Sequence, residues 1–269
     1  MRRFEGRYPG TMRYASLASG SRGNCHALTD GERTLLIDAG ISYLQIRTRL
    51  ETLGWEVGAV KAVAFTHEHS DHIAALPVLL KRTDWCILAT EETLQAICRI
   101  QGVTVPVNRW IPLRPGHATS WEGWRIVPFS TPHDAADPVG YRVEAGGMAA
   151  VIVTDLGHPT ALVADHCRSL DLLALEANHD VQMLREGSYP PQLKARILSR
   201  VGHLSNESMA ELLGRVRSSR LRAVVLAHLS EQNNEPELAR FAAEEVLRDS
   251  GIPLYVASQR EPLSVAATG

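Results

Sequence analysis

Three histidines and an aspartate follow one apolar segment within six residues, and this cluster constrains the fold more than any other feature. Residues 61–65 read Lys-Ala-Val-Ala-Phe, which predicts a short buried strand, and residues 67–72 read His-Glu-His-Ser-Asp-His. On an extended loop, His67 and His69 point to one side, while Asp71 and His72 reach a second position beyond it. The cluster predicts a loop that holds two metal ions. The alternative is a solvated polar surface loop.

The spacing of this loop excludes the helical zinc-protease motif. That motif, H-E-x-x-H, needs a second histidine four residues after the first, so that both lie on one face of a helix. The residue four positions after His67 is Asp71.

Other metal-ligand residue types stand where predicted strands end. His133 follows residues 127–132, Asp155 follows residues 151–154, and His228 follows residues 223–227. A carboxylate at Asp155 could bridge two cations while it stays ionised. Asp38 also ends an apolar run, and we expect it to anchor a ligand histidine rather than to touch a metal. The alternative for each of these residues is an ordinary hydrogen-bonded structural role.

Composition limits the class of protein. Apolar residues make up 45% and charged residues 22% of 269 residues, which is typical of a globular chain. No apolar run approaches the roughly 18 residues of a membrane span, and the first residues lack a signal-peptide core, so we expect a cytoplasmic protein. The four cysteines form no CxxC pair. A net charge of −2 excludes an overall basic nucleic-acid binder, so such binding would need a local patch.

The predicted elements alternate between helix and strand, and a Gly146-Gly147 turn joins two of the strands, which favours mixed sheets. We expect residues 1–11 to form a tail and residues 12–269 to form a single α/β domain with helices outside two sheets. Predicted helices cover residues 73–81, 91–101, 160–168, 191–201, 206–217 and 235–250. Predicted strands include residues 86–89, 124–129, 139–144, 148–153, 171–176, 222–227 and 253–257.

The sequence resembles the metallo-β-lactamase superfamily from residue 19 to about residue 258. The H-x-H-x-D-H loop of that family matches residues 67–72, and its downstream histidine, bridging aspartate and final histidine match His133, Asp155 and His228. Within the superfamily the chain is most similar to the bacterial YycJ/WalJ group, DNA exonucleases related to ribonuclease Z. The segments that carry this similarity are residues 19–24, 36–40, 66–72, 133–141, 175–180, 202–207 and 227–230.

The resemblance implies an αββα sandwich of two mixed β-sheets flanked by helices. Residues 156–227 are too few for the inserted cap domain of the larger RNA-processing branch. The family's Thr-Asp-Thr-Gly is Thr-Asp-Leu-Gly at residues 154–157, which leaves the ligand in place.

The resemblance also implies a ligand set for two divalent cations. His67, His69 and His133 would bind one cation, Asp71, His72 and His228 the other, and Asp155 both. Such a nitrogen-rich set suits zinc or manganese. Cations about 3.5–4 Å apart lower the pKa of a bridging water, so that a hydroxide attacks the phosphodiester.

The leaving oxygen needs a proton, and His203 precedes a helix start at Ser205, where phosphate also binds well. The similarity to ribonuclease Z implies that His203 is the acid and Glu176 its orienting partner. The alternative is that His203 and its neighbours only cap the helix. The catalytic candidates are therefore His203, Glu176 and Asp71. The candidates for contacts to the ligands or to substrate are Asn24, Asp38, His179 and Asn206.

Residues 185–222 contain eight Lys or Arg and three acids, and this local excess could hold a nucleic-acid backbone or simply form a solvated surface. We therefore expect a metal-dependent phosphodiesterase, most simply a DNA exonuclease, with no organic cofactor and no membrane partner. The alternatives are a small-molecule metallo-hydrolase acting on a thioester, lactone or cyclic phosphodiester, and a non-catalytic protein that keeps the fold.

Overall fold

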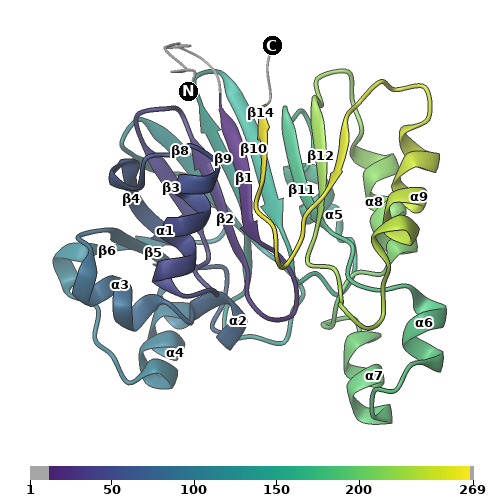
Figure 1. The fold of residues 1–269 in the computed structure, drawn as a ribbon, viewed down its shortest axis with the longest axis horizontal. Coiled ribbons are helices and arrows are strands. Elements are labelled where there is room, and N and C mark those ends of the chain that lie inside the picture. The colour runs from purple at the N-terminus through teal and green to yellow at the C-terminus, as the bar shows by residue number, and fades with distance from the viewer. Residues whose placement is uncertain (1–11, 267–269) are drawn as a thin grey trace.

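Two seven-stranded β-sheets pack face to face in the computed structural model, which describes residues 12–266 (Figure 1). The first sheet contains, in spatial order, β14 (Leu263–Ala266), β1 (Arg13–Ala18), β2 (Cys25–Thr29), β3 (Thr34–Ile37), β4 (Val60–Ala64), β5 (Cys86–Thr90) and β6 (Trp110–Leu113). The second contains β13 (Leu254–Val256), β12 (Ala223–Ala227), β11 (Leu172–Glu176), β10 (Met148–Val153), β9 (Val139–Ala145), β8 (Trp124–Ser130) and β7 (Thr119–Trp121). The predicted pair of mixed sheets is confirmed.

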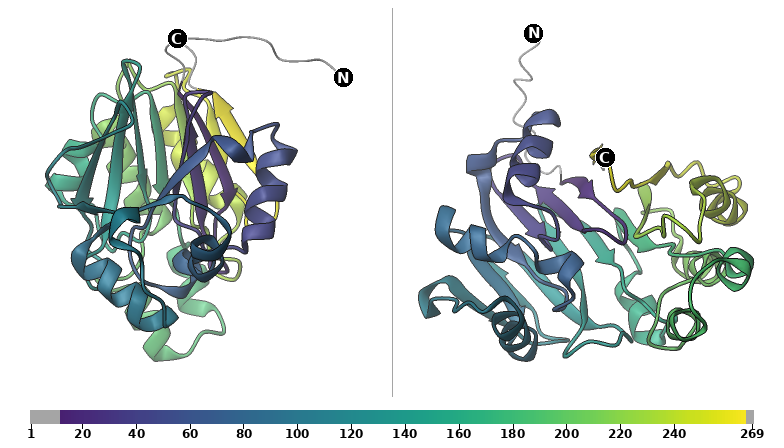
Figure 2. Two further views of the ribbon diagram at one scale, coloured as in Figure 1. Left: turned by 90° about the vertical axis from the view of Figure 1, so that its left-hand side faces the viewer. Right: turned by 60° about the horizontal axis from the view of Figure 1, so that its bottom comes forward.

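Helices cover the outer faces of both sheets, as the two views of Figure 2 show. The helices of the described residues are α1 (Tyr43–Thr52), α2 (Ser70–Ile73), α3 (Leu76–Arg82), α4 (Glu91–Gln101), α5 (Ala161–His166), α6 (Val181–Glu186), α7 (Pro191–Ile197), α8 (Asn206–Val216) and α9 (Pro236–Leu247). Two short 3₁₀ turns lie at Val57–Ala59 and Val107–Arg109. No helix in the described range, 12–266, has the length and apolar character to cross a bilayer.

The apolar core forms three layers because neighbouring residues of a strand point to opposite faces. In β10, Ala150 and Ile152 pack between the sheets, whereas Val151 and Val153 pack under α5, α8 and α9. A third layer lies under α1, α3 and α4. Covering on both faces explains why β10 reads as a continuous apolar run rather than an alternating one.

Several predicted elements match the structure and others differ for local reasons. Helix α4 has the predicted bounds, whereas the helix predicted at 73–81 is two helices, α2 and α3. Pro77 lies in the first turn of α3, where its missing N–H costs nothing, and so a helix begins there instead of continuing. Strands β6, β7 and β14 were not predicted. All three are edge strands of three or four residues, and β6 contains Pro112, which makes it resemble a loop.

The predicted tail, residues 1–11, lies outside the described residues. Residues 156–227 contain α5, β11, α6, α7, α8 and β12, and this part of the described chain contains no inserted cap domain.

The sheets are joined directly beneath the histidine loop. The Tyr141 hydroxyl of β9 donates a hydrogen bond to the Phe65 carbonyl at 2.5 Å, and the Val139 N–H donates to the Thr66 carbonyl at 3.1 Å. Tyr141 and Phe65 are fully buried. Strand β9 belongs to the second sheet, whereas Phe65 follows β4 of the first sheet. These hydrogen bonds therefore fix the position of the histidine loop relative to the second sheet.

We predict that Tyr141→Phe lowers the free energy of unfolding by about 1–3 kcal/mol, because the Phe65 carbonyl is left buried without its donor. Urea denaturation followed by circular dichroism measures the change. Tyr43→Phe is the matched control, since Tyr43 is only partly buried, and we expect a change within about 0.5 kcal/mol. Equal stabilities for the Tyr141 variant and the wild type would contradict this role.

Candidate metal centre

The site lies at the edge of the sandwich where β3, β4, β8, β10, β11 and β12 end. In the loop after β4, His67 and His69 precede α2, and Asp71 and His72 lie within its single turn. His69 is the N-cap residue with an extended backbone, and the His72 N–H donates to its carbonyl at 2.9 Å. This change from extended to helical backbone turns the first two histidines and the last two ligand-type residues toward different positions.

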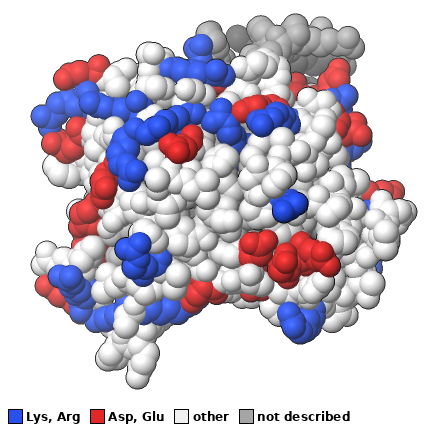
Figure 3. Space-filling view, turned by 180° about the vertical axis from the view of Figure 1, so that it is seen from behind, with Lys and Arg blue, Asp and Glu red and all other residues white. Residues whose placement is uncertain are grey.

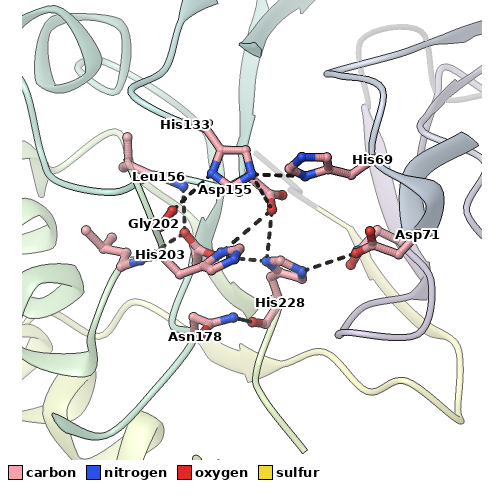
Figure 4. Close-up of polar contacts among 12 residues, drawn as sticks. His69, Asp71, His133, Asp155, Leu156, Asn178, Gly202, His203 and His228 are labelled. Atoms are coloured by element: carbon pink, nitrogen blue, oxygen red, sulfur yellow. Dashed lines mark hydrogen bonds and ion pairs between the residues drawn. The ribbon is translucent and has the colours of Figure 1, made fainter. Parts of the chain in front are cut away.

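His67, His69 and His133 form the first group of possible ligands. Their nitrogens lie within 4.8 Å of one another, and His69 Nδ1 is 3.3 Å from His133 Nε2 (Figure 4). His133 Nδ1 donates to the Gly202 carbonyl at 3.0 Å, which leaves Nε2 facing the other two histidines. The structure thus brings together three residues that the sequence assigned to one cation.

Asp71, His72 and His228 form the second group. Asp71 Oδ2 lies 3.4 Å from His72 Nε2 and 3.8 Å from His228 Nε2. Asp155 stands between the groups. Its Oδ2 is 3.4 Å from His72 Nε2, and its Oδ1 is 3.6 Å from His133 Nε2.

The donor set fits divalent metal ions. His67 Nε2 and Asp155 Oδ2 are buried and have no hydrogen-bond partner, which is costly for a polar atom unless a cation takes the partner's place. Imidazole nitrogens with carboxylate oxygens are the ligands that zinc and similar metals prefer.

The carboxylates dominate the electrostatics of the centre. Burial alone would lower the pKa of His72, but Asp155, Asp38 and Asp71 outweigh it and raise that pKa well above its ordinary range. Burial raises the pKa of Asp155, but His228, His72 and further imidazoles hold it well below its ordinary value. Burial itself, with His72 nearby, holds the pKa of His67 well below normal.

Asp38 and Asn24 contact residues of the second group. Asp38 accepts hydrogen bonds from His72 Nδ1 at 2.8 Å and from the Thr66 N–H and hydroxyl at 2.8 Å each. Asn24 Nδ2 lies 3.2 Å from Asp71 Oδ2 and 3.1 Å from His72 Nε2. Thr66 was not singled out from the sequence, although its position directly before His67 could have pointed to it.

Glu176 joins two histidines through one oxygen. Its Oε1 accepts from His203 Nδ1 at 2.9 Å and from His228 Nδ1 at 2.8 Å, while Oε2 accepts from the Leu156 and Leu204 N–H groups. Burial opposes ionisation, but His203 and His228 lower the pKa of Glu176 to about 2. Burial also opposes protonation of His228, but Asp155, Asp71 and Glu176 raise its pKa to about 10. The link to His228 was not predicted.

His179 and Asn206 lie beside the start of α8. The Asn206 N–H donates to the His179 carbonyl at 2.9 Å, and the Asn206 amide exchanges hydrogen bonds of 2.8 and 3.0 Å with Asn234. His179 belongs to none of the possible metal groups among residues 12–266. Burial lowers its pKa to about 4. As predicted, Ser205 caps α8, and its hydroxyl accepts from the Ser208 N–H.

The comparisons with known proteins agree with this fold. The model of the "Beta-lactamase superfamily domain" matches residues 33–229. The chain therefore belongs to the β-lactamase superfamily. The crystal structure of the metallo-β-lactamase fold protein YhfI from Bacillus subtilis superposes with a TM-score of 0.71 and 16% identity, over 95% of this chain and 100% of that one.

Within the superfamily, the chain is similar to two curated bacterial proteins. It is 34% identical to "Exodeoxyribonuclease YycJ" of Bacillus anthracis over 240 residues, which cover 89% of this chain and 90% of the relative. It is 38% identical to "Exodeoxyribonuclease WalJ" of Streptococcus pneumoniae over 232 residues, which cover 86% of each chain. The predicted resemblance to this group is confirmed.

We predict that loading with Zn²⁺ or Mn²⁺ at pH 7 releases protons. His72 and His228 hold raised pKa values in the metal-free protein, about 10 for His228, and a histidine nitrogen must lose its proton to bind a metal. Affinity therefore rises with pH until these groups are already deprotonated. Titration calorimetry in buffers of different ionisation enthalpy counts the protons.

Ca²⁺ is the control cation, because it prefers an all-oxygen set, and we expect little uptake. Tight uptake of Zn²⁺ at pH 7 without proton release would contradict the raised pKa values.

Proposed function

We propose that the chain is a metal-dependent phosphodiesterase that degrades DNA from an end. The observation that carries the proposal is the geometry of Glu176, which lies against both the possible metal cluster and His203. The similarity to two exodeoxyribonucleases over most of the chain supports DNA as the substrate.

The ligand set divides into two groups in this proposal. His67, His69 and His133 would hold one divalent cation, Asp71, His72 and His228 would hold the other, and Asp155 would serve both. Either zinc or manganese fits the nitrogen-rich donors. When bound, the two cations supply an activated water and neutralise charge on the phosphodiester.

The chain's own residues position and move protons. Asp38 holds His72 through Nδ1, and Gly202 holds His133 through Nδ1, so that in both rings Nε2 faces the cluster. Glu176 accepts a hydrogen bond from His203 Nδ1–H. His203 would therefore act as an imidazolium that gives its Nε2 proton to the leaving oxygen and becomes a neutral ring with its proton on Nδ1. The His203 side chain is 16% exposed, so substrate can reach it from solvent. Glu176 and His203 therefore act as an orienting base and a general acid.

A direct test measures hydrolysis of end-labelled duplex DNA, single-stranded DNA and a chromogenic phosphodiester with Mn²⁺ and with Zn²⁺. The proposal expects end-dependent loss of label from DNA. Hydrolysis of the small diester without any action on DNA would favour a small-molecule hydrolase instead.

We predict that Asp71→Ala abolishes hydrolysis of all these substrates while the fold is retained. The substitution removes a ligand of one cation but leaves the strands intact. Mass spectrometry of bound metal, circular dichroism and the DNA assay measure the effect. Asp84→Ala removes a carboxylate from an exposed loop position and is the matched control, with normal activity expected. Unchanged turnover in the Asp71 variant would exclude the two-cation mechanism.

We predict that His203→Ala slows the chemical step on DNA by about 10²–10⁴, the usual contribution of general acid catalysis, with metal content unchanged. A 4-nitrophenolate leaving group barely needs a proton, so hydrolysis of a nitrophenyl phosphodiester stays nearly normal. Single-turnover kinetics on both substrates measure the difference. His117→Ala, at an exposed position, is the control.

Two other outcomes would contradict the acid role of His203. An equal loss of activity on both substrates would mean that His203 serves the metal centre as a whole and not the leaving oxygen. Loss of bound metal would make it a ligand, which its 3.7 Å separation from Asp155 also allows.

A further inference from the structure

Helices α6 and α7 form a lobe beside the metal centre (Figure 1). Seen from behind, Lys and Arg side chains lie over this lobe at the lower left of Figure 3. The basic residues of the stretch 185–222 therefore lie in two different places on the molecule. Arg220 lies against Asp171, which precedes β11, whereas Arg196 and Arg200 lie next to the loops that carry His133 and Asp155.

Residues 200–202, which follow α7, contact both the loop that carries His133 and the loop that carries Asp155. The Asp134 N–H donates to the Val201 carbonyl at 3.2 Å, and His133 Nδ1 donates to the Gly202 carbonyl. A Cβ at Gly157 would lie 2.3 Å from the Arg200 carbonyl oxygen, so only glycine allows this approach. The position of α7 relative to the centre is therefore fixed by the backbone.

Arg196 projects from α7 toward the centre and is held by a carboxylate. Its Nε lies 2.5 Å from Asp134 Oδ2, and its Nη2 lies 3.0 Å from Asp134 Oδ1. Asp134 Oδ1 is in turn 3.6 Å from His133 Nε2. The guanidinium thus lies one carboxylate away from a nitrogen that faces the metal cluster, and the Arg196 side chain is 46% exposed.

We propose that Arg196 binds the backbone phosphate next to the scissile one and exchanges Asp134 for that phosphate when DNA enters. This proposal rests on the proposed nuclease function. The ligand groups would hold the cations that bind the scissile phosphate, and Arg196 lies beyond Asp134 from His133 of those groups, so its guanidinium would meet a neighbouring phosphate. A planar guanidinium binds phosphate through two parallel hydrogen bonds, and a half-exposed ion pair with a carboxylate costs little to exchange.

The test compares Arg196→Gln, Arg196→Lys and the wild type, each loaded with Mn²⁺, on two substrates. One is a single-stranded oligonucleotide and the other is bis(4-nitrophenyl) phosphate, which has no neighbouring phosphate. For Arg196→Gln, we expect the KM for the oligonucleotide to rise about 10- to 100-fold with kcat nearly unchanged. Kinetics on the small diester stay normal. The number of counterions released on DNA binding, measured from the salt dependence of the affinity, falls by about one.

Arg196→Lys keeps the charge but loses the two-pronged geometry, so its KM lies between the other two. The control is Arg168→Gln, which removes another exposed arginine paired with a carboxylate, Asp165, and leaves both substrates unaffected.

Three results would overturn the assignment. Equal loss on both substrates would mean that Arg196 acts on the scissile phosphate or through the cluster. A lower melting temperature with an unchanged KM would mean that the pair with Asp134 only fastens α7. If the wild type hydrolyses the small diester but neither binds nor degrades DNA, the proposed function fails and the assignment fails with it.

Discussion

The buried carboxylate of Asp155 is the group on which the rest of the structure depends. It is 2% exposed, and a buried anion without partners would be prohibitively costly. Its partners come from both sheets, since His72 and His67 follow β4 of the first sheet, whereas His133 and His228 follow strands of the second. Asp155 itself follows β10 of the second sheet, so separation of the two sheets at this edge would remove His72 and His67 from it and leave only His133 and His228. The charge of Asp155 therefore favours close contact between the two sheets where their strands end.

Glu176 couples the candidate metal cluster to His203, the proposed acid. A single oxygen accepts from both His203 and His228, so the orientation of the proposed acid and of a proposed ligand cannot vary independently. The parallel register of β11 and β12 places Glu176 opposite Ala227, immediately before His228. Pairing of two core strands, and not loop structure, thus sets this geometry. The other oxygen binds two backbone N–H groups, which fixes the carboxylate itself.

The fold class and the residues that gather at the centre could be predicted from the sequence, because the signals for them lie in short segments of the chain. Ligand residue types directly follow apolar strands, and parallel strands end at one edge. The unpredicted features depend on pairing between distant segments. The second contact of Glu176 follows from strand register, and the Asn206–Asn234 amide pair joins residues on different segments. The Asp134–Arg196 pair depends on how α7 packs, which no periodicity in the chain reveals.

Backbone conformation adds a reason for these residue types at these positions. Asp38, Asp155 and His228 each follow a strand and have φ values of +62°, +56° and +56°. This left-handed region is unfavourable for most side chains, but aspartate and histidine adopt it several-fold more often than average. Surrounding bonds hold the turns, such as the bond from the Asp38 N–H to the Ala64 carbonyl at 2.8 Å and from the His228 N–H to the Ser19 hydroxyl at 2.7 Å. At each of these three positions one residue therefore provides both the sharp turn after a buried strand and a polar side chain of the candidate centre.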